Sequence, residues 1–144
     1  MKKAELIVEF AIQEYPVESQ LKYWVAYLEG ELIIRINGRI FFQESNMLLI
    51  EFGMALRKWL STVEESGLGV PMRYFTMDHD EEEGAILALE PVTSNCYQIH
   101  SIWQAFSCQE CIDEQELMAV ATLFIERLDQ ELDRERLLRL SGKP

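Results

Sequence analysis

The sequence predicts an α+β fold in which antiparallel β meanders carry two helices packed on one side. Short apolar stretches separated by turn residues indicate strands, and two longer stretches with apolar residues at helical spacing indicate helices. Their order is β-βββ-α-βββ-α, which resembles a faint internal βββα repeat. A length of 144 residues is typical of one domain, so we expect residues 1–144 to form a single α+β domain.

The first part of the chain predicts one strand followed by a three-stranded meander. Residues 4–12 (AELIVEFAI) alternate with a period of two, the pattern of a strand with one face in water. Residues 22–43 predict the meander, and in the favoured register Trp24, Arg35 and Ile40 share one of its faces. Both faces are largely apolar, so we expect both to be covered.

Two turns are expected within this meander. Asn37-Gly38 is the stronger signal, because both residues tolerate the positive φ of a two-residue type I′ turn. A two-residue loop there would place Ile34 opposite Phe41. A second turn is expected at residues 29–30, where the sequence leaves the hairpin register open, and a slip of one residue would swap the faces of the strand before it.

The remaining elements are a helix, three strands and a final helix. Residues 46–65 predict the first helix, capped by Ser45 or Asn46 and ended by Gly67. Three strands are expected at 72–77, 85–90 and 95–103. The last helix begins near 114, behind a capping-box pair formed by Asp113 and Glu116. Continued to residue 140 it would be about 40 Å long, so we expect its end and tail (130–144) to protrude, fray or pack on another subunit.

Acidic residues are concentrated in one segment. The net charge is −12, yet the interval 74–126 contains no lysine or arginine, and the rest of the chain nearly balances 13 basic against 14 acidic residues. Such a charge argues against nucleic acid as a ligand, because phosphate binding needs a basic face. No stretch approaches the ~20 apolar residues of a membrane span. We therefore expect a cytoplasmic protein with no membrane partner, in which Cys96, Cys108 and Cys111 are reduced thiols.

The most charged stretch is MDHDEEEG at residues 77–84. Its start resembles a calcium loop, but Glu83 stands where that pattern needs glycine, and Leu89 occupies the position of the final glutamate. Adjacent carboxylates on a hairpin tip also lack the contrasting environments that acid–base catalysis requires. Two interpretations are left, a solvated turn or a docking surface for a basic protein partner, which would use Asp78, Asp80, Glu81, Glu82 and Glu83.

Other candidate sites are weaker. Cys108-x-x-Cys111 supplies only two of the four ligands of a structural zinc site, and the usual redox βαβ context is missing. His100 and Ser101 have no nucleophile motif around them. The sequence therefore predicts no catalytic residue, no metal and no cofactor. Trp24 and Arg35 form a second contact candidate, because interfaces are enriched in tryptophan and arginine.

The stretches YWVAYLEGELIIRINGRIFFQE, LLIEFGMALRKWL and IHSIWQAF resemble an uncharacterised family of small acidic bacterial proteins. The resemblance covers most of residues 5–130 and implies no catalytic residues. The general build (small, acidic and α+β) also resembles the immunity proteins of bacterial toxin systems.

Three functions are compatible with these observations. The first is a non-enzymatic protein-binding module, such as an immunity protein that neutralises a basic toxin through its acidic surface. The second is a homodimeric structural or regulatory protein that uses a spare sheet face or the helix end at 130–140. The third is a small enzyme with an unrecognised site, which would need a pocket holding His100 with a carboxylate or thiol in reach.

Overall fold

A computed structural model describes residues 4–18, 20–67, 69–75, 81–93 and 95–140, and it confirms the α+β fold. The elements in chain order are β1 (Leu6–Glu14), α1 (Leu21–Tyr27), β2 (Glu29–Ile36), β3 (Arg39–Leu48), α2 (Leu49–Ser66), β4 (Met72–Tyr74), the 3-10 helix η1 (Glu81–Glu83), β5 (Leu87–Thr93), β6 (Cys96–His100), β7 (Ile112–Asp113) and α3 (Glu114–Leu140).

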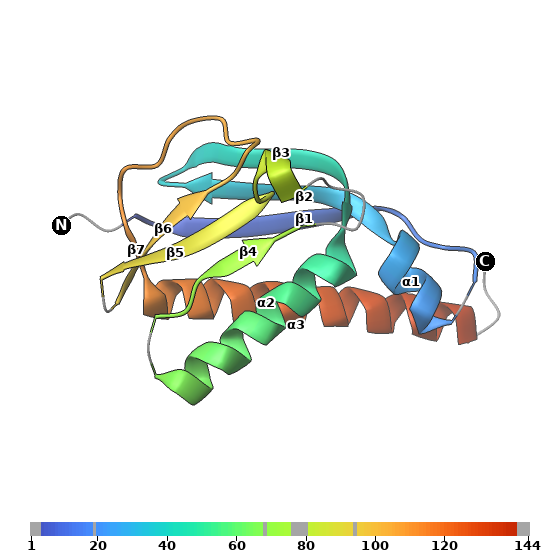
Figure 1. The fold of residues 1–144 in the computed structure, drawn as a ribbon. Helices are drawn as coiled ribbons and strands as arrows, with labels where there is room; N and C mark the ends of the chain where they lie inside the picture. Colours follow the sequence, from blue (N-terminus) through green and yellow to red (C-terminus); the bar gives the residue numbers. More distant parts are fainter. Residues whose placement is uncertain (1–3, 19, 68, 76–80, 94, 141–144) are drawn as a thin grey trace.

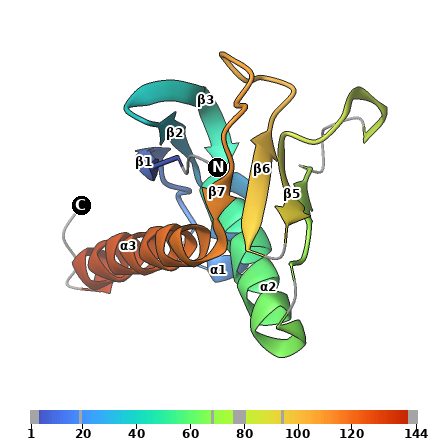
Figure 2. The same ribbon diagram turned by 90° about the vertical axis from the view of Figure 1, so that its left-hand side faces the viewer.

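The strands form two antiparallel sheets above the long helices. One sheet has the order β1-β2-β3 and the other β4-β5-β6-β7. Figure 1 shows α2 and α3 beneath the sheets, with α1 at one end. Figure 2 shows the two sheets side by side, seen nearly along α3. The helices therefore cover one side of both sheets, as predicted.

The core lies where the inner faces of both sheets meet α2 and α3. Phe124 of α3 is its centre, with ring centroids 5.3 Å from Phe10 of β1 and 5.4 Å from Phe52 of α2. The alternation predicted for the first strand is confirmed, because Leu6 is buried in this core whereas Ile7, on the opposite face, is 40% exposed.

The prediction of a strand at the start of the meander is wrong, because residues 21–27 form helix α1. Aromatic and β-branched residues favour a strand locally, but tertiary packing overrides that preference. Trp24 and Leu28, four positions apart, are both buried. The Trp24 indole donates a hydrogen bond to the Glu18 carbonyl (2.7 Å), and its ring meets Tyr15 edge-on.

The expected turn at residues 29–30 is also wrong, because both residues lie in β2, where Gly30 pairs with Ile12 and Met47. Glycine is required at this point by a close approach of the neighbouring chain. A Cβ atom on Gly30 would lie 2.5 Å from the Ala11 carbonyl oxygen and 2.5 Å from the Leu49 side chain.

The Asn37-Gly38 turn is confirmed, with φ of 52° and 80° and Ile36 paired with Arg39. The register beyond it differs from the prediction, because a β-bulge makes Phe42, and not Phe41, the partner of Ile34. Both phenylalanines are buried as a result.

The prediction for α2 is wrong at its start, whereas α3 begins at Glu114 as predicted. β3 runs on to Leu48, so α2 begins at Leu49 without a side-chain cap, while Gly67 ends it with φ of 68° as expected. At the start of α3, the Asp113 carboxylate accepts a hydrogen bond from the Gln115 amide (3.1 Å). α3 continues to Leu140, and Leu137 in its last turns is 67% exposed. No helix in the described residues is long and apolar enough to cross a membrane.

Candidate protein-binding surfaces

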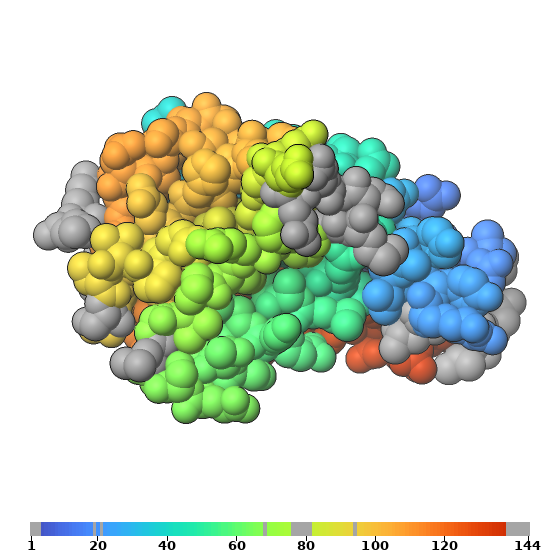
Figure 3. Space-filling view, in the orientation of Figure 1, coloured from blue at the N-terminus to red at the C-terminus, as the bar shows by residue number. Residues whose placement is uncertain are grey.

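The acidic loop, residues 78–83, connects β4 to β5. Asp78 and Asp80 lie outside the described residues, whereas Glu82 and Glu83 are exposed on η1. The base of the hairpin is closed by a hydrogen bond from the Ile86 amide to the Tyr74 carbonyl (2.9 Å). η1 projects from the sheet away from the helices (Figure 2), and the space-filling view shows it at the surface above β4 and α2 (Figure 3).

Several other carboxylates of the acidic interval are engaged in structural contacts. Four of them bind a partner within the chain: Glu90 with the Arg73 guanidinium (2.8 Å), Glu110 with the Asn37 amide nitrogen (2.7 Å), Glu114 with the Tyr97 hydroxyl (2.9 Å) and Glu116 with the Leu6 backbone amide (2.8 Å). The interval is therefore not one continuous acidic surface. At the acidic loop, Glu83 is exposed and makes no hydrogen bond or ion pair within the described chain, and the same holds for Glu126 on α3.

Trp24 and Arg35 do not form a common patch. The prediction that they share a sheet face is wrong for Trp24, because this residue lies in α1 and is 1% exposed. Arg35 lies on β2 opposite Ile40 of β3, as the predicted pairing required. A partner could therefore reach Arg35 but not the indole ring.

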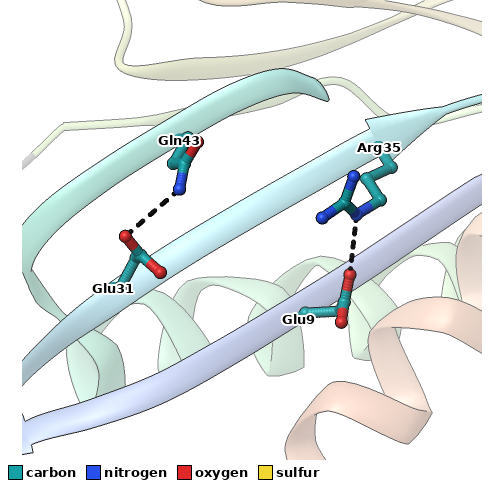
Figure 4. A network of polar contacts seen from close by, with 4 residues as sticks. All are labelled: Glu9, Glu31, Arg35 and Gln43. Atoms are coloured by element: carbon teal, nitrogen blue, oxygen red, sulfur yellow. Dashed lines mark hydrogen bonds and ion pairs between the residues drawn. The ribbon is translucent and has the colours of Figure 1, made fainter. Parts of the chain in front are cut away.

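Arg35 belongs to a polar network on the outer face of the three-stranded sheet (Figure 4). Its Nε atom lies 3.0 Å from Glu9 Oε1, and Gln43 donates a hydrogen bond to Glu31 (3.3 Å). The Arg35 and Glu9 side chains are 35% and 47% exposed, so their ion pair contributes only about 0–1 kcal/mol to stability. The expectation that both faces of this sheet are covered is wrong, because its outer face is open.

Two buried tyrosines connect the four-stranded sheet to the helices. The Tyr97 hydroxyl donates to Glu114 and accepts from the Val70 amide (2.9 Å each). The Tyr74 hydroxyl donates to Glu51 of α2 (3.0 Å). Burial raises the pKa of both phenols, and the neighbouring carboxylate, Glu114 or Glu51, raises it further. Both tyrosines therefore stay neutral at neutral pH and donate hydrogen bonds to these carboxylates.

The raised pKa of Tyr74 predicts a loss of stability in alkali. The unfolded chain releases this proton near pH 10 while the folded chain keeps it, so stability is full below about pH 10 and falls above it. Above pH 10, one such group lowers the free energy of unfolding by about 1.4 kcal/mol per pH unit. We expect urea unfolding between pH 9 and 11.5 to show a shallower decline for Tyr74→Phe than for the wild type. Parallel declines would show that Tyr74 titrates normally.

The cysteines differ from the expectation of three reduced thiols. Cys96 of β6 and Cys111 form a disulfide with a Cα–Cα distance of 5.6 Å, and Cys108 is a buried free thiol. The thiol of Cys108 donates to the Glu110 carbonyl (3.4 Å). The Cys108-x-x-Cys111 pair is therefore not a redox pair in this form, and sulfurs already joined to each other cannot serve as thiolate ligands of zinc.

His100 and Ser101 have no shared catalytic geometry. His100 is exposed at the end of β6, whereas Ser101 is buried and its hydroxyl accepts a hydrogen bond from the Trp103 amide (3.0 Å). His79 lies outside the described residues. The geometry thus gives the third hypothesis, an enzyme that uses His100, no support.

Comparison with known proteins identifies the family and no relative of known activity. No curated protein and no solved structure matches the chain. The family described as "Domain of unknown function (DUF7878)" matches residues 7–134, which is most of the chain and includes every strand except the first residue of β1. The chain therefore belongs to the DUF7878 family.

Proposed function

We propose that this protein is a non-enzymatic protein-binding module that docks a basic protein partner through its acidic loop. One observation carries the proposal. Four other carboxylates of the interval 74–126 are paired or hydrogen-bonded within the fold, whereas Glu83 is left exposed at a projecting tip with Glu82 beside it. No lysine or arginine occurs between residues 74 and 126 of the sequence.

A projecting charged tip favours fast and selective association. Opposite charges accelerate diffusional encounter and repel partners of the wrong sign, although they add less to the final affinity. Speed and selectivity are what an immunity protein needs, because it must neutralise its toxin before the toxin acts. We therefore favour an immunity protein of a bacterial toxin system as the biological setting, with a basic toxin as the partner.

The proposal is tested by affinity capture from a lysate of the source cell, using immobilised protein at low salt. We expect wild-type protein to retain a basic protein that elutes as the salt concentration rises, because surface charges are screened by salt. The double variant Glu82→Gln, Glu83→Gln should retain much less of it. The matched control is Glu64→Gln, Glu65→Gln, which makes the same charge change at two exposed carboxylates of α2.

Two outcomes would contradict the proposal. One is equal retention by the wild type and the Glu82/Glu83 variant. The other is an equal loss in both double variants, because that result would assign binding to net charge alone and not to the acidic loop.

A further inference from the structure

The outer edge of β1 is an open row of backbone hydrogen-bonding groups. β1 is an edge strand, paired only with β2. The Asn37 amide donates to the Glu5 carbonyl, which fixes the odd-numbered residues as those that face β2. The even-numbered residues Val8, Phe10 and Ile12 therefore turn their amides and carbonyls outward. Within the described chain, nothing bonds to these outward groups.

The edge is covered at one end and open at the other. At the covered end, the Ala4 amide donates to the Cys111 carbonyl (3.0 Å) and the Leu6 amide donates to Glu116 of α3 (2.8 Å). Beyond Leu6, an open groove of about 610 Å³ separates β1 from α3. Its walls are the edge from Val8 to Ile12 together with Tyr15, and the α3 side chains Arg127, Gln130, Glu131, Arg134 and Glu135.

The usual protections of an edge strand are missing along this stretch. Residues 8–12 (VEFAI) contain no proline, no lysine and no inward-facing charge. Phe10 packs on Phe124 from the inner face, but Val8, Phe10 and Ile12 are all only partly buried. An added strand would bond to the outward backbone groups and cover these side chains at the same time.

We infer that this groove binds an extended segment of a partner protein by β-strand addition. Three outward residues at alternate positions match about five residues of added strand, or about 16 Å. A second copy of the chain does not fit, because the outward Leu6 amide bonds to α3 and α3 extends outward past β1 (Figure 2).

Charge in the groove defines the chemistry of the segment. Arg134 is paired with Glu131 (2.7 Å). Arg127 is exposed and has no ion pair within the described residues. A carboxylate on the added strand would supply the missing partner of Arg127, and apolar side chains on the same face of that strand would lie beside Phe10. Because Phe10 and Arg127 line the same groove, the expected ligand is an extended segment whose groove-facing residues, at alternate positions, include both apolar residues and a carboxylate.

The test uses a blocked seven-residue peptide with valine at positions two and four, glutamate at position six and threonine elsewhere, titrated into the full chain and followed by backbone NMR. We expect saturable shifts at Val8, Phe10 and Ile12, with slowed hydrogen exchange of their amides. Replacing glutamate by lysine in the peptide should weaken binding by about two- to fivefold, the range of an exposed ion pair. Two further peptides carry N-methyl groups on alternate amides, one on the amides that face β1 and the other on those that face away. Only the first should lose binding.

Substitutions in the protein separate the groove from general charge. Arg127→Gln should remove the preference for glutamate over lysine, whereas Arg136→Gln, an exposed arginine of α3 outside the groove, should keep it. Chemical-shift changes confined to other parts of the chain would overturn the inference, and so would equal binding by both N-methylated peptides. So would a dimer in sedimentation equilibrium with Val8, Phe10 and Ile12 protected. The acidic loop is not part of this groove. The capture experiment for the loop and the peptide titration for the groove can therefore fail or succeed independently.

Discussion

Replacing Phe124 by alanine is expected to destabilise the fold by about 3–5 kcal/mol, the usual effect of removing a fully buried phenylalanine. Phe124 is 1% exposed, and its ring contacts Phe10 of the first sheet and Phe52 of α2. The substitution removes both edge-to-face contacts and leaves a cavity at the junction of β1, α2 and α3. The surrounding strands and helices belong to a closed core and cannot collapse fully into that cavity.

Chemical denaturation measures this effect. The matched control is Leu123→Ala, one position earlier on the same helix, because Leu123 is 45% exposed and its loss should change the free energy of unfolding by less than about 1 kcal/mol. Equal destabilisation by the two substitutions would contradict the packing described for α3.

Removing the Cys96–Cys111 disulfide has the second-largest expected effect. The bond closes a loop of 15 residues. Cross-linking a loop of that size restricts the unfolded chain and stabilises the fold by about 3 kcal/mol in the chain-entropy treatment. The double variant Cys96→Ala, Cys111→Ala should therefore unfold at a lower denaturant concentration. The wild type in a reducing agent should unfold near the same midpoint.

Cys108→Ala is the matched control, because this thiol is equally buried but lies outside the disulfide. Cys108→Ala should lower the free energy of unfolding by less than the double variant does. Its unfolding midpoint should still fall when a reducing agent is added. Three free thiols in the unfolded, non-reduced wild type would show that the bond does not form. A stable disulfide is more typical of an oxidising compartment than of the cytoplasm. The cytoplasmic location therefore stays a prediction, and the disulfide counts against it.

Local sequence signals predicted the elements whose cause is local. The turn at Asn37-Gly38 needs positive φ at two successive residues, and the helix end at Gly67 needs it at one. Because these residue types favour positive φ, both positions could be predicted from the sequence. Strand β1 alternates with a period of two, and the first half of α3 has buried residues at helical spacing (Leu117, Ala121, Phe124 and Leu128). Helix α1 was missed because its aromatic residues favour a strand, and only the burial of Trp24 shows that packing decides otherwise.

The contacts of the acidic interval could not be predicted, because they join residues far apart in the sequence. Glu116 bonds to an amide 110 positions away, and Glu110 to a side chain 73 positions away. From the sequence, every carboxylate between residues 74 and 126 counted equally toward an acidic surface. The fold uses some of them internally, and this difference concentrates the candidate site on the acidic loop.

The groove beside β1 was absent from the sequence interpretation for a related reason. The alternation in residues 6–12 indicates a strand but does not show which of its edges is paired. Only the sheet order reveals β1 as an edge strand, and only the position of α3 shows where that edge is left open.

The central claim is that the acidic loop steers a basic partner, and the most direct measurement is the association rate of the captured partner at several ionic strengths. We expect the wild-type rate to fall steeply with salt, because electrostatic steering is screened. For Glu82→Gln, Glu83→Gln, the low-salt rate should be about three- to tenfold lower and its salt dependence shallower, with the dissociation rate changed less. Glu64→Gln, Glu65→Gln should behave like the wild type. Identical association rates and salt slopes for the wild type and the Glu82/Glu83 variant would contradict the claim.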